Sequence, residues 1–226
     1  LARVPFSASL ASVAVERVFD GLTLVGFIFL GLTLANLPAG VTLGDTPITD
    51  VANRAAILSL IALVGALGVV AFPRLAERVV RAVLPVPRLA DKLVGVIQGI
   101  RQGFAALQSP ARIGGALAWS VVIWMVNSLS FWAAFLAFDI PVGIPGGMLL
   151  CGILAFGISL PSTPGYVGVF EGVIILALAL FGVGREQAFA YAATYHVTTF
   201  IPITLLGLWS MARTRIGLGE ARSHAG

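Results

Sequence analysis

The sequence predicts an all-α integral membrane protein: a polytopic helical bundle that contains one re-entrant hairpin of broken helices. Of the 226 residues, 58% are hydrophobic and 11% are charged, and the mean hydropathy is +1.01. Soluble domains carry about 25% charged residues, which they need to cover their surface. Long apolar runs and the arginines between them give the order of the helices.

Five apolar runs make up the single transmembrane domain that we expect over residues 1–226. A helix needs about 20 residues to cross the hydrocarbon core. The runs at residues 9–37, 55–72, 113–138 and 188–211 therefore predict four crossings. The run at residues 145–181 is too long for one helix and too short for two complete crossings, which predicts a re-entrant hairpin.

The distribution of cations predicts the orientation in the membrane. The 73–112 connection holds seven cations and two acids, whereas the 38–53 connection has two acids and no cation. By the positive-inside rule, the 73–112 segment and the arginine-bearing C-terminus face the cytoplasm. We therefore expect a multi-pass protein of the inner (cytoplasmic) membrane. Apolar residues recur at helical spacing between residues 89 and 107, which predicts an amphipathic helix on the membrane surface within the 73–112 segment.

Three ionisable residues, Glu16, Arg17 and Asp20, lie inside the first predicted span. A charge at membrane depth costs at least ~2.5–3.5 kcal/mol on insertion scales, so these groups need partners or an aqueous cavity. One interpretation is an intramembrane salt bridge that fixes helix packing. The interpretation we favour is a polar cavity in which Arg17 contacts a lipid phosphate, because the planar guanidinium can donate two parallel hydrogen bonds. The carboxylates would hold Arg17 or meet a cationic head group.

The densest cluster of helix-breaking residues lies within residues 160–172. Pro161 and Pro164 remove backbone donors and stop the incoming helix. Gly165 and Gly168 allow unusual dihedral angles and close approach of another backbone. Non-helical backbone survives at membrane depth only where it is buried in protein or lines a cavity. The alternative is a packing kink.

The second half of the hairpin is expected to begin near Tyr166–Gly168 and to present free amide groups. Such amides, together with the helix dipole, form an anion site. Ser162 and Thr163 would cap this end or donate to a phosphate oxygen. Glu171 would complement the dipole or pair with Arg17.

Three further polar residues, Asn127, Tyr195 and His196, are candidates for lining a head-group path. Asn127 shares a helix face with Ser120, and hydrogen bonding between helices is the commoner role of such residues. His196 could titrate, although a lone histidine is more often a hydrogen-bonded core residue. Cys151 is the single cysteine, and the two histidines are far apart in the sequence, so we expect no disulfide, metal or cofactor.

Residues 16–20 (Glu-Arg-Val-Phe-Asp) and residues 161–171 (Pro-Ser-Thr-Pro-Gly-Tyr-Val-Gly-Val-Phe-Glu) carry a resemblance to a known family. The sequence resembles the transmembrane domain of the lysylphosphatidylglycerol synthase/flippase family. The resemblance implies transport of aminoacylated phosphatidylglycerol to the outer leaflet. No aminoacyl-transferase domain is evident, so it implies a stand-alone member and no synthase activity. Family members usually carry further helices before the Glu-Arg motif, and the chain begins at Leu1, so we expect N-terminal truncation.

These features together predict a lipid flippase or translocase with a head-group groove between the first helix, the hairpin and the last helix. Its expected ligands are anionic or aminoacylated phospholipids, and its expected protein partners are a separate lipid synthase and a second copy in a homodimer. We expect neither nucleic-acid binding nor enzyme activity, because no catalytic or nucleotide-binding motif is evident. The expected substrate-binding residues are Glu16, Arg17, Asp20, Asn127, Ser162, Thr163, Gly165, Tyr166, Gly168, Glu171, Tyr195 and His196.

Three alternatives remain. A membrane-embedded enzyme acting on a lipid-phosphate or polyprenyl-phosphate would need a metal motif or a nucleophilic pair. A small-molecule or ion transporter would share the broken helices without needing an opening toward lipid. A structural partner of a synthase would need neither feature.

Overall fold

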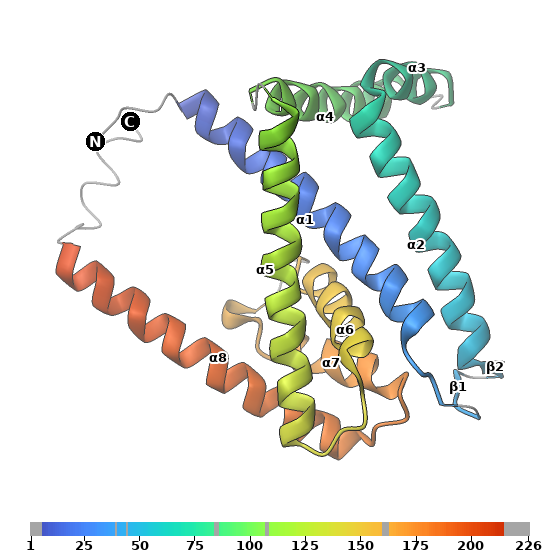
Figure 1. The fold of residues 1–226 in the computed structure, drawn as a ribbon, viewed down its shortest axis with the longest axis vertical. Coiled ribbons are helices and arrows are strands. Elements are labelled where there is room, and N and C mark those ends of the chain that lie inside the picture. The colour runs from blue at the N-terminus through green and yellow to red at the C-terminus, as the bar shows by residue number, and fades with distance from the viewer. Residues whose placement is uncertain are drawn as a thin grey trace.

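Helices make up nearly all of the structure, which is a computed structural model (Figure 1). It describes residues 6–38, 40–43, 45–83, 86–106, 109–159 and 163–214. Within these ranges the β-structure is one antiparallel pair of two-residue strands, β1 (Thr42–Leu43) and β2 (Thr46–Pro47). The predicted all-α class is therefore confirmed.

Four helices are long and apolar enough to cross a membrane. They are α1 (Phe6–Leu34), α2 (Ile48–Ala71), α5 (Pro110–Ala137) and α8 (Arg185–Thr214). In α2 only 6% of the most apolar window is buried inside the protein. An apolar surface of this size would drive association in water, whereas lipid solvates it. The chain is thus a multi-pass membrane protein.

All four helices begin before the apolar runs predicted for them, and in α2 and α5 polar residues stabilise the added first turns. α2 begins at Ile48 and includes Asp50, whose charge is favourable near the positive end of the helix dipole. α5 begins at Pro110, and the side chain of Ser109 caps it by accepting a 3.3 Å hydrogen bond from the Arg112 amide.

The predicted broken hairpin is present as α6 (Ile144–Gly157) and α7 (Val169–Ala179), with the single 3-10 turn η1 (Pro164–Tyr166) between them. At 1.5 Å per residue, α6 is about 21 Å long, which is shorter than a ~30 Å hydrocarbon core. α6 packs against α1, α5 and α7, and α7 also packs against α8. The largest fully buried side chains of this core are Phe135, Leu149, Leu150, Ile174, Leu178 and Tyr191.

The 73–112 connection contains two helices where we expected one amphipathic helix. They are α3 (Pro73–Val83) and α4 (Pro87–Ala106). Both lie across one end of the long helices (Figure 1). Ala90, Val94 and Ile97 of α4 are buried, and α4 contacts α1 and α2, whereas no residue of α3 is buried.

Glycine allows a close contact between α1 and α6. A Cβ atom at Gly31 of α1 would lie 2.6 Å from Leu149 Cβ and 2.8 Å from the Pro145 carbonyl oxygen, both on α6. Small residues commonly permit such close backbone approach in membrane helices. Gly26, also on α1, has no heavy atom within 4 Å of the corresponding position.

Gly31→Ala should therefore destabilise the protein, since a methyl group there has to push α1 and α6 apart. Overpacking of this kind costs about 1–3 kcal/mol. The matched control is Gly26→Ala, which gains the same helix propensity in open space and should not lower stability. The measurement is the free energy of unfolding in detergent, and equal values for both variants would contradict the α1–α6 contact.

Candidate functional site

The three charged residues of α1 form one connected cluster. Nη2 of Arg17 lies 3.1 Å from Glu16 Oε1, and Nη1 lies 3.8 Å from Asp20 Oδ2. Both carboxylates thus contact Arg17, which is one of the two roles expected for them. The Arg17 side chain remains 69% exposed, whereas that of Asp20 is 15% exposed. The cluster thus has one anchored acid and one accessible cation.

Asp20 is anchored by α5. Its Oδ1 atom accepts hydrogen bonds from Ser120 Oγ at 2.6 Å and from the Trp124 indole nitrogen at 2.9 Å. Ser120 lies ten residues after the start of α5, or about 15 Å along the helix. A carboxylate at this depth needs such donors, because unpaired buried charge is costly. Ser120 therefore joins two helices, as its polar character predicted.

Arg17 also lines an apolar groove with a volume of about 410 Å³. The α1 wall includes Gly21, the α2 wall includes Ala62 and Ala66, and α6 contributes Phe156. The small side chains leave room between the helices. The full lining is Arg17, Val18, Gly21, Leu22, Val25, Ala62, Ala66, Val69, Val70 and Phe156.

The walls of this groove differ from those of the head-group groove that we expected from the sequence. We expected the last helix to form a wall, but α2 takes that position because it packs directly along α1. α8 instead packs against α7 and contacts α5. The hairpin contributes Phe156, the residue before the last one of α6, so the groove reaches the point where the chain leaves α6 for the break.

The break between α6 and α7 is held by local hydrogen bonds. Three of its residues have positive φ angles: Gly165 (71°), Tyr166 (60°) and Gly168 (88°). Tyr166 is uncommon in this region of backbone space because it carries a Cβ atom. Thr163 Oγ1 donates to the Val167 carbonyl at 2.7 Å, and the Tyr166 amide donates to the Thr163 carbonyl at 2.9 Å. We had expected Thr163 to cap α7 or to donate to a phosphate oxygen. Its hydroxyl instead closes the turn before α7.

Glu171 caps α7 instead. Its Oε2 atom accepts a 2.6 Å hydrogen bond from the Gly168 amide, and its Oε1 atom lies 2.6 Å from His196 Nδ1 on α8. We expected Glu171 to interact with the start of its own helix or with Arg17. The structure shows the first interaction. The carboxylate occupies the position where we expected a phosphate, so the Gly168 amide is already engaged. Ser162, the other expected capping residue, lies outside the described residues.

His196 is a buried, hydrogen-bonded histidine between aromatic rings. Phe170 stacks on its imidazole with ring centroids 4.3 Å apart, and Phe200 meets it edge-on at 5.7 Å. The simpler of the two interpretations of His196 therefore fits its surroundings. Within the described ranges, no three His, Cys, Asp or Glu side chains gather where they could hold a metal ion.

Tyr195 and Asn127 differ in their hydrogen bonds, since Tyr195 bonds to another helix and Asn127 bonds within its own. The Tyr195 hydroxyl is 3.0 Å from Ser130 Oγ, and its ring stacks on Phe131 at 4.6 Å, so it joins α8 to α5. Asn127 donates to the Ile123 carbonyl of its own helix and has an exposed side chain. Among the residues that the structure describes, it forms no hydrogen bond to another helix.

Most of the predicted site residues that the structure describes fall into two groups, and Asn127 and Tyr195 belong to neither. The first is the α1 cluster of Glu16, Arg17 and Asp20, which is bonded to α5. The second is the break with Glu171 and His196, which is bonded to α8. In the part of the chain that the structure describes, no hydrogen bond or ion pair joins the two groups.

Sequence reasoning missed the contribution of α2 and of Trp124. The signal for α2 was present in the spacing of Ala62 and Ala66, which places two small residues on one helix face. The signal for Trp124 was an indole far from either end of a span, where its N–H needs a partner.

Glu171→Ala should loosen the first turn of α7, because the Gly168 amide loses its acceptor. Caps of this type are worth about 0.5–2 kcal/mol, so amide hydrogen exchange there should become about 2- to 30-fold faster. The matched control is Glu186→Ala, which removes an acid from the first turn of α8. That variant should leave exchange in α7 unchanged, and an equal effect of both variants would rule out the specific cap.

Comparison with known proteins identifies the family of this chain. The family model described as the lysylphosphatidylglycerol synthase TM region matches residues 1–207. A Haloferax volcanii protein named Glycosyltransferase AglD is 28% identical over 248 aligned positions. The alignment covers 96% of this chain and 39% of that relative, so the chain spans about two fifths of its length. No solved structure matches the chain. Because the family model covers far more than half of the sequence, the chain belongs to the family of lysylphosphatidylglycerol synthase transmembrane regions.

Proposed function

We propose that this chain moves a phospholipid between the leaflets of the membrane. The observation that carries the proposal is the position of Arg17, a largely exposed cation on an otherwise apolar groove. A phospholipid has the complementary chemistry, with a phosphate joined to long apolar chains. In this proposal an acyl chain lies between α1 and α2, and Arg17 holds the phosphate.

The neighbours of Arg17 give it the properties that this role requires. A guanidinium can donate two parallel hydrogen bonds to a phosphate, and its charge persists at any physiological pH. Asp20 fixes one side of Arg17 and is itself held by α5. Glu16 is exposed beside it and would meet the amine of an aminoacylated head group. A zwitterionic or aminoacylated lipid would therefore find both of its charges matched.

The break between α6 and α7 would supply the movement. Translocation needs a path that opens and closes, and hinges are usually a few residues that absorb large changes in φ and ψ. Phe156 links the end of α6 to the groove, and positive-φ glycines at Gly165 and Gly168 follow in the break. We propose that Glu171 and His196 stabilise one state of this hinge.

The cellular setting follows from the same proposal. The cation-rich α3–α4 layer and the C-terminus would face the cytoplasm of an inner-membrane protein. The ligand would be an anionic or aminoacylated phospholipid such as lysylphosphatidylglycerol. A separate synthase would supply it, and the chain would act without catalytic residues of its own. A homodimer is the assembly that we expect.

A second candidate function rests on the relative that is named a glycosyltransferase. Under this alternative, the groove would present a lipid-linked phosphate, such as a polyprenyl phosphate, to an enzyme without moving it across the membrane. The two candidates share a phosphate on a long apolar chain and differ in the fate of the lipid. Binding of polyprenyl phosphate without any translocation of phospholipid would favour the second candidate.

Arg17→Ala should strongly reduce translocation in liposomes that contain the purified chain and fluorescent phosphatidylglycerol. Charge-assisted hydrogen bonds contribute about 1.5–3 kcal/mol, so the rate above the protein-free background should fall about 10- to 150-fold. The measurement is the fraction of label that a membrane-impermeant quencher reaches over time. Arg54→Ala removes an exposed arginine eight residues before Ala62 on α2 and should change the rate less than twofold. Translocation that persists in Arg17→Ala would exclude this site.

Gly21→Leu should block the groove without unfolding the protein. A Cβ atom at Gly21 meets no heavy atom within 4 Å, so the added side chain would fill the groove that Gly21 lines. The matched control is Gly65→Leu on α2, which also has open space but does not line the groove. We expect translocation to fall at least tenfold in the first variant only. Equal rates in the two variants would mean that the lipid takes another route.

A further inference from the structure

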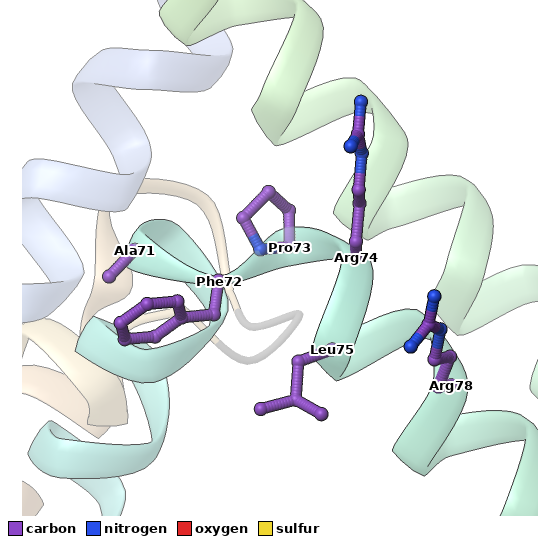
Figure 2. A pocket seen from close by; sticks show the side chains of 6 residues that line it. All are labelled: Ala71, Phe72, Pro73, Arg74, Leu75 and Arg78. Atoms are coloured by element: carbon purple, nitrogen blue, oxygen red, sulfur yellow. The ribbon is translucent and has the colours of Figure 1, made fainter.

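The junction of α2 and α3 forms a second cavity that the proposed translocation does not use. α2 ends at Ala71, and α3 begins at Pro73 after the single residue Phe72, whose φ and ψ are −129° and 60°. Proline suits the first turn of a helix because it needs no amide donor there. The cavity has a volume of about 590 Å³ and is lined by Ala71, Phe72, Pro73, Arg74, Leu75 and Arg78 (Figure 2). We call these six residues the elbow.

Two arginines supply the charge of the elbow. Arg74 and Arg78 are one helical turn apart, and Figure 2 shows both guanidinium groups on the same side of α3, with Leu75 pointing the other way. Neither forms a salt bridge with any residue that the structure describes. Arg81, by contrast, pairs with Asp91 of α4 at 3.0 Å. The elbow therefore has two cations that no described acid pairs with, and the Arg81–Asp91 pair joins α3 to α4.

The remaining acid of α3 does not neutralise these cations. Glu77 lies on the polar face of the helix, but it forms no salt bridge within the described ranges. Its Oε1 atom is shielded and has no hydrogen-bond partner in the structure. α3 and α4 together hold six cations and two acids. The surroundings of the elbow thus favour an anion.

The other side of the elbow is apolar and exposed. Phe72 is 65% exposed and Leu75 is 57% exposed, and Val79 and Val83 continue the same apolar face along α3. This face follows directly from α2, whose surface is almost entirely outside the protein core. An amphipathic helix at the end of a membrane span lies at the boundary between head groups and acyl chains. The exposed apolar side chains therefore face the acyl region of the bilayer.

We propose that the elbow is a binding site for an anionic phospholipid. Arg74 and Arg78 bind its phosphate, and Phe72 and Leu75 contact the upper part of an acyl chain. A free phosphate would use the arginines alone, whereas the adjoining apolar surface selects a ligand with a chain. This site is distinct from the groove at Arg17 and does not depend on translocation.

The test is lipid binding to the purified full chain, measured by native mass spectrometry with phosphatidylglycerol and phosphatidylcholine of identical chains. Each arginine near anionic lipid contributes about fivefold in affinity, so R74Q/R78Q should bind phosphatidylglycerol about 10- to 30-fold more weakly. Phosphatidylcholine binding should change less than twofold. The control R54Q, which removes one positive charge near the other end of α2, should retain wild-type affinity within twofold.

Several results would overturn the site. One is unchanged phosphatidylglycerol binding in R74Q/R78Q, and another is an equal loss in R54Q, which would indicate unspecific charge attraction. Displacement of the lipid by millimolar glycerol phosphate would show a free-phosphate site instead. If the glutamine pair does not fold, Leu75→Ser keeps both charges and should still weaken binding through the lost chain contact. The same loss should appear in an Arg17→Ala background, where a failure of translocation leaves the elbow intact.

Discussion

Two acids of the helical bundle, Asp20 and Glu171, receive hydrogen bonds from donors on neighbouring helices or at a helix end. Lipid offers no water to solvate charge, so an ionised carboxylate inside the bundle depends on such donors. Asp20 obtains them from Ser120 and Trp124 of α5, and Glu171 obtains them from the Gly168 amide and from His196 on α8. Both acids therefore join their own helix to a neighbouring one. This requirement fixes where α1 meets α5 and where α7 meets α8.

The same requirement separates structural charge from charge that is available to a ligand. Asp20 uses one oxygen for α5 and turns the other toward Arg17, so that Arg17 is oriented without being enclosed. Both oxygens of Glu171 are engaged in hydrogen bonds within the protein, one with the Gly168 amide and one with His196. The expected phosphate site at the start of α7 is thus filled by the protein's own carboxylate. Of the predicted polar residues, Arg17 is the one best placed to meet a phosphate.

The sequence predicted the helices and the break better than it predicted the contacts between helices. Apolar length identified the spans, and two prolines with two glycines identified the break, because both features act locally on the backbone. The wall that α2 provides was missed, since small residues such as Ala62 mark a close approach without naming the helix that approaches. Glu171 had two plausible partners at the sequence level, and only the packing of α8 brings His196 to it.

Most of the surface of α2 is not buried in the protein, and it lines both proposed lipid sites. Its residues Val70 and Ala71 are consecutive, yet the first lines the groove at Arg17 and the second lines the elbow. The groove at Arg17 and the elbow therefore adjoin along one lipid-facing helix, the groove along its span and the elbow at its end. A helix that packed tightly on both sides would exclude lipid from both places. The 6% burial of the α2 window is what leaves both accessible from the bilayer.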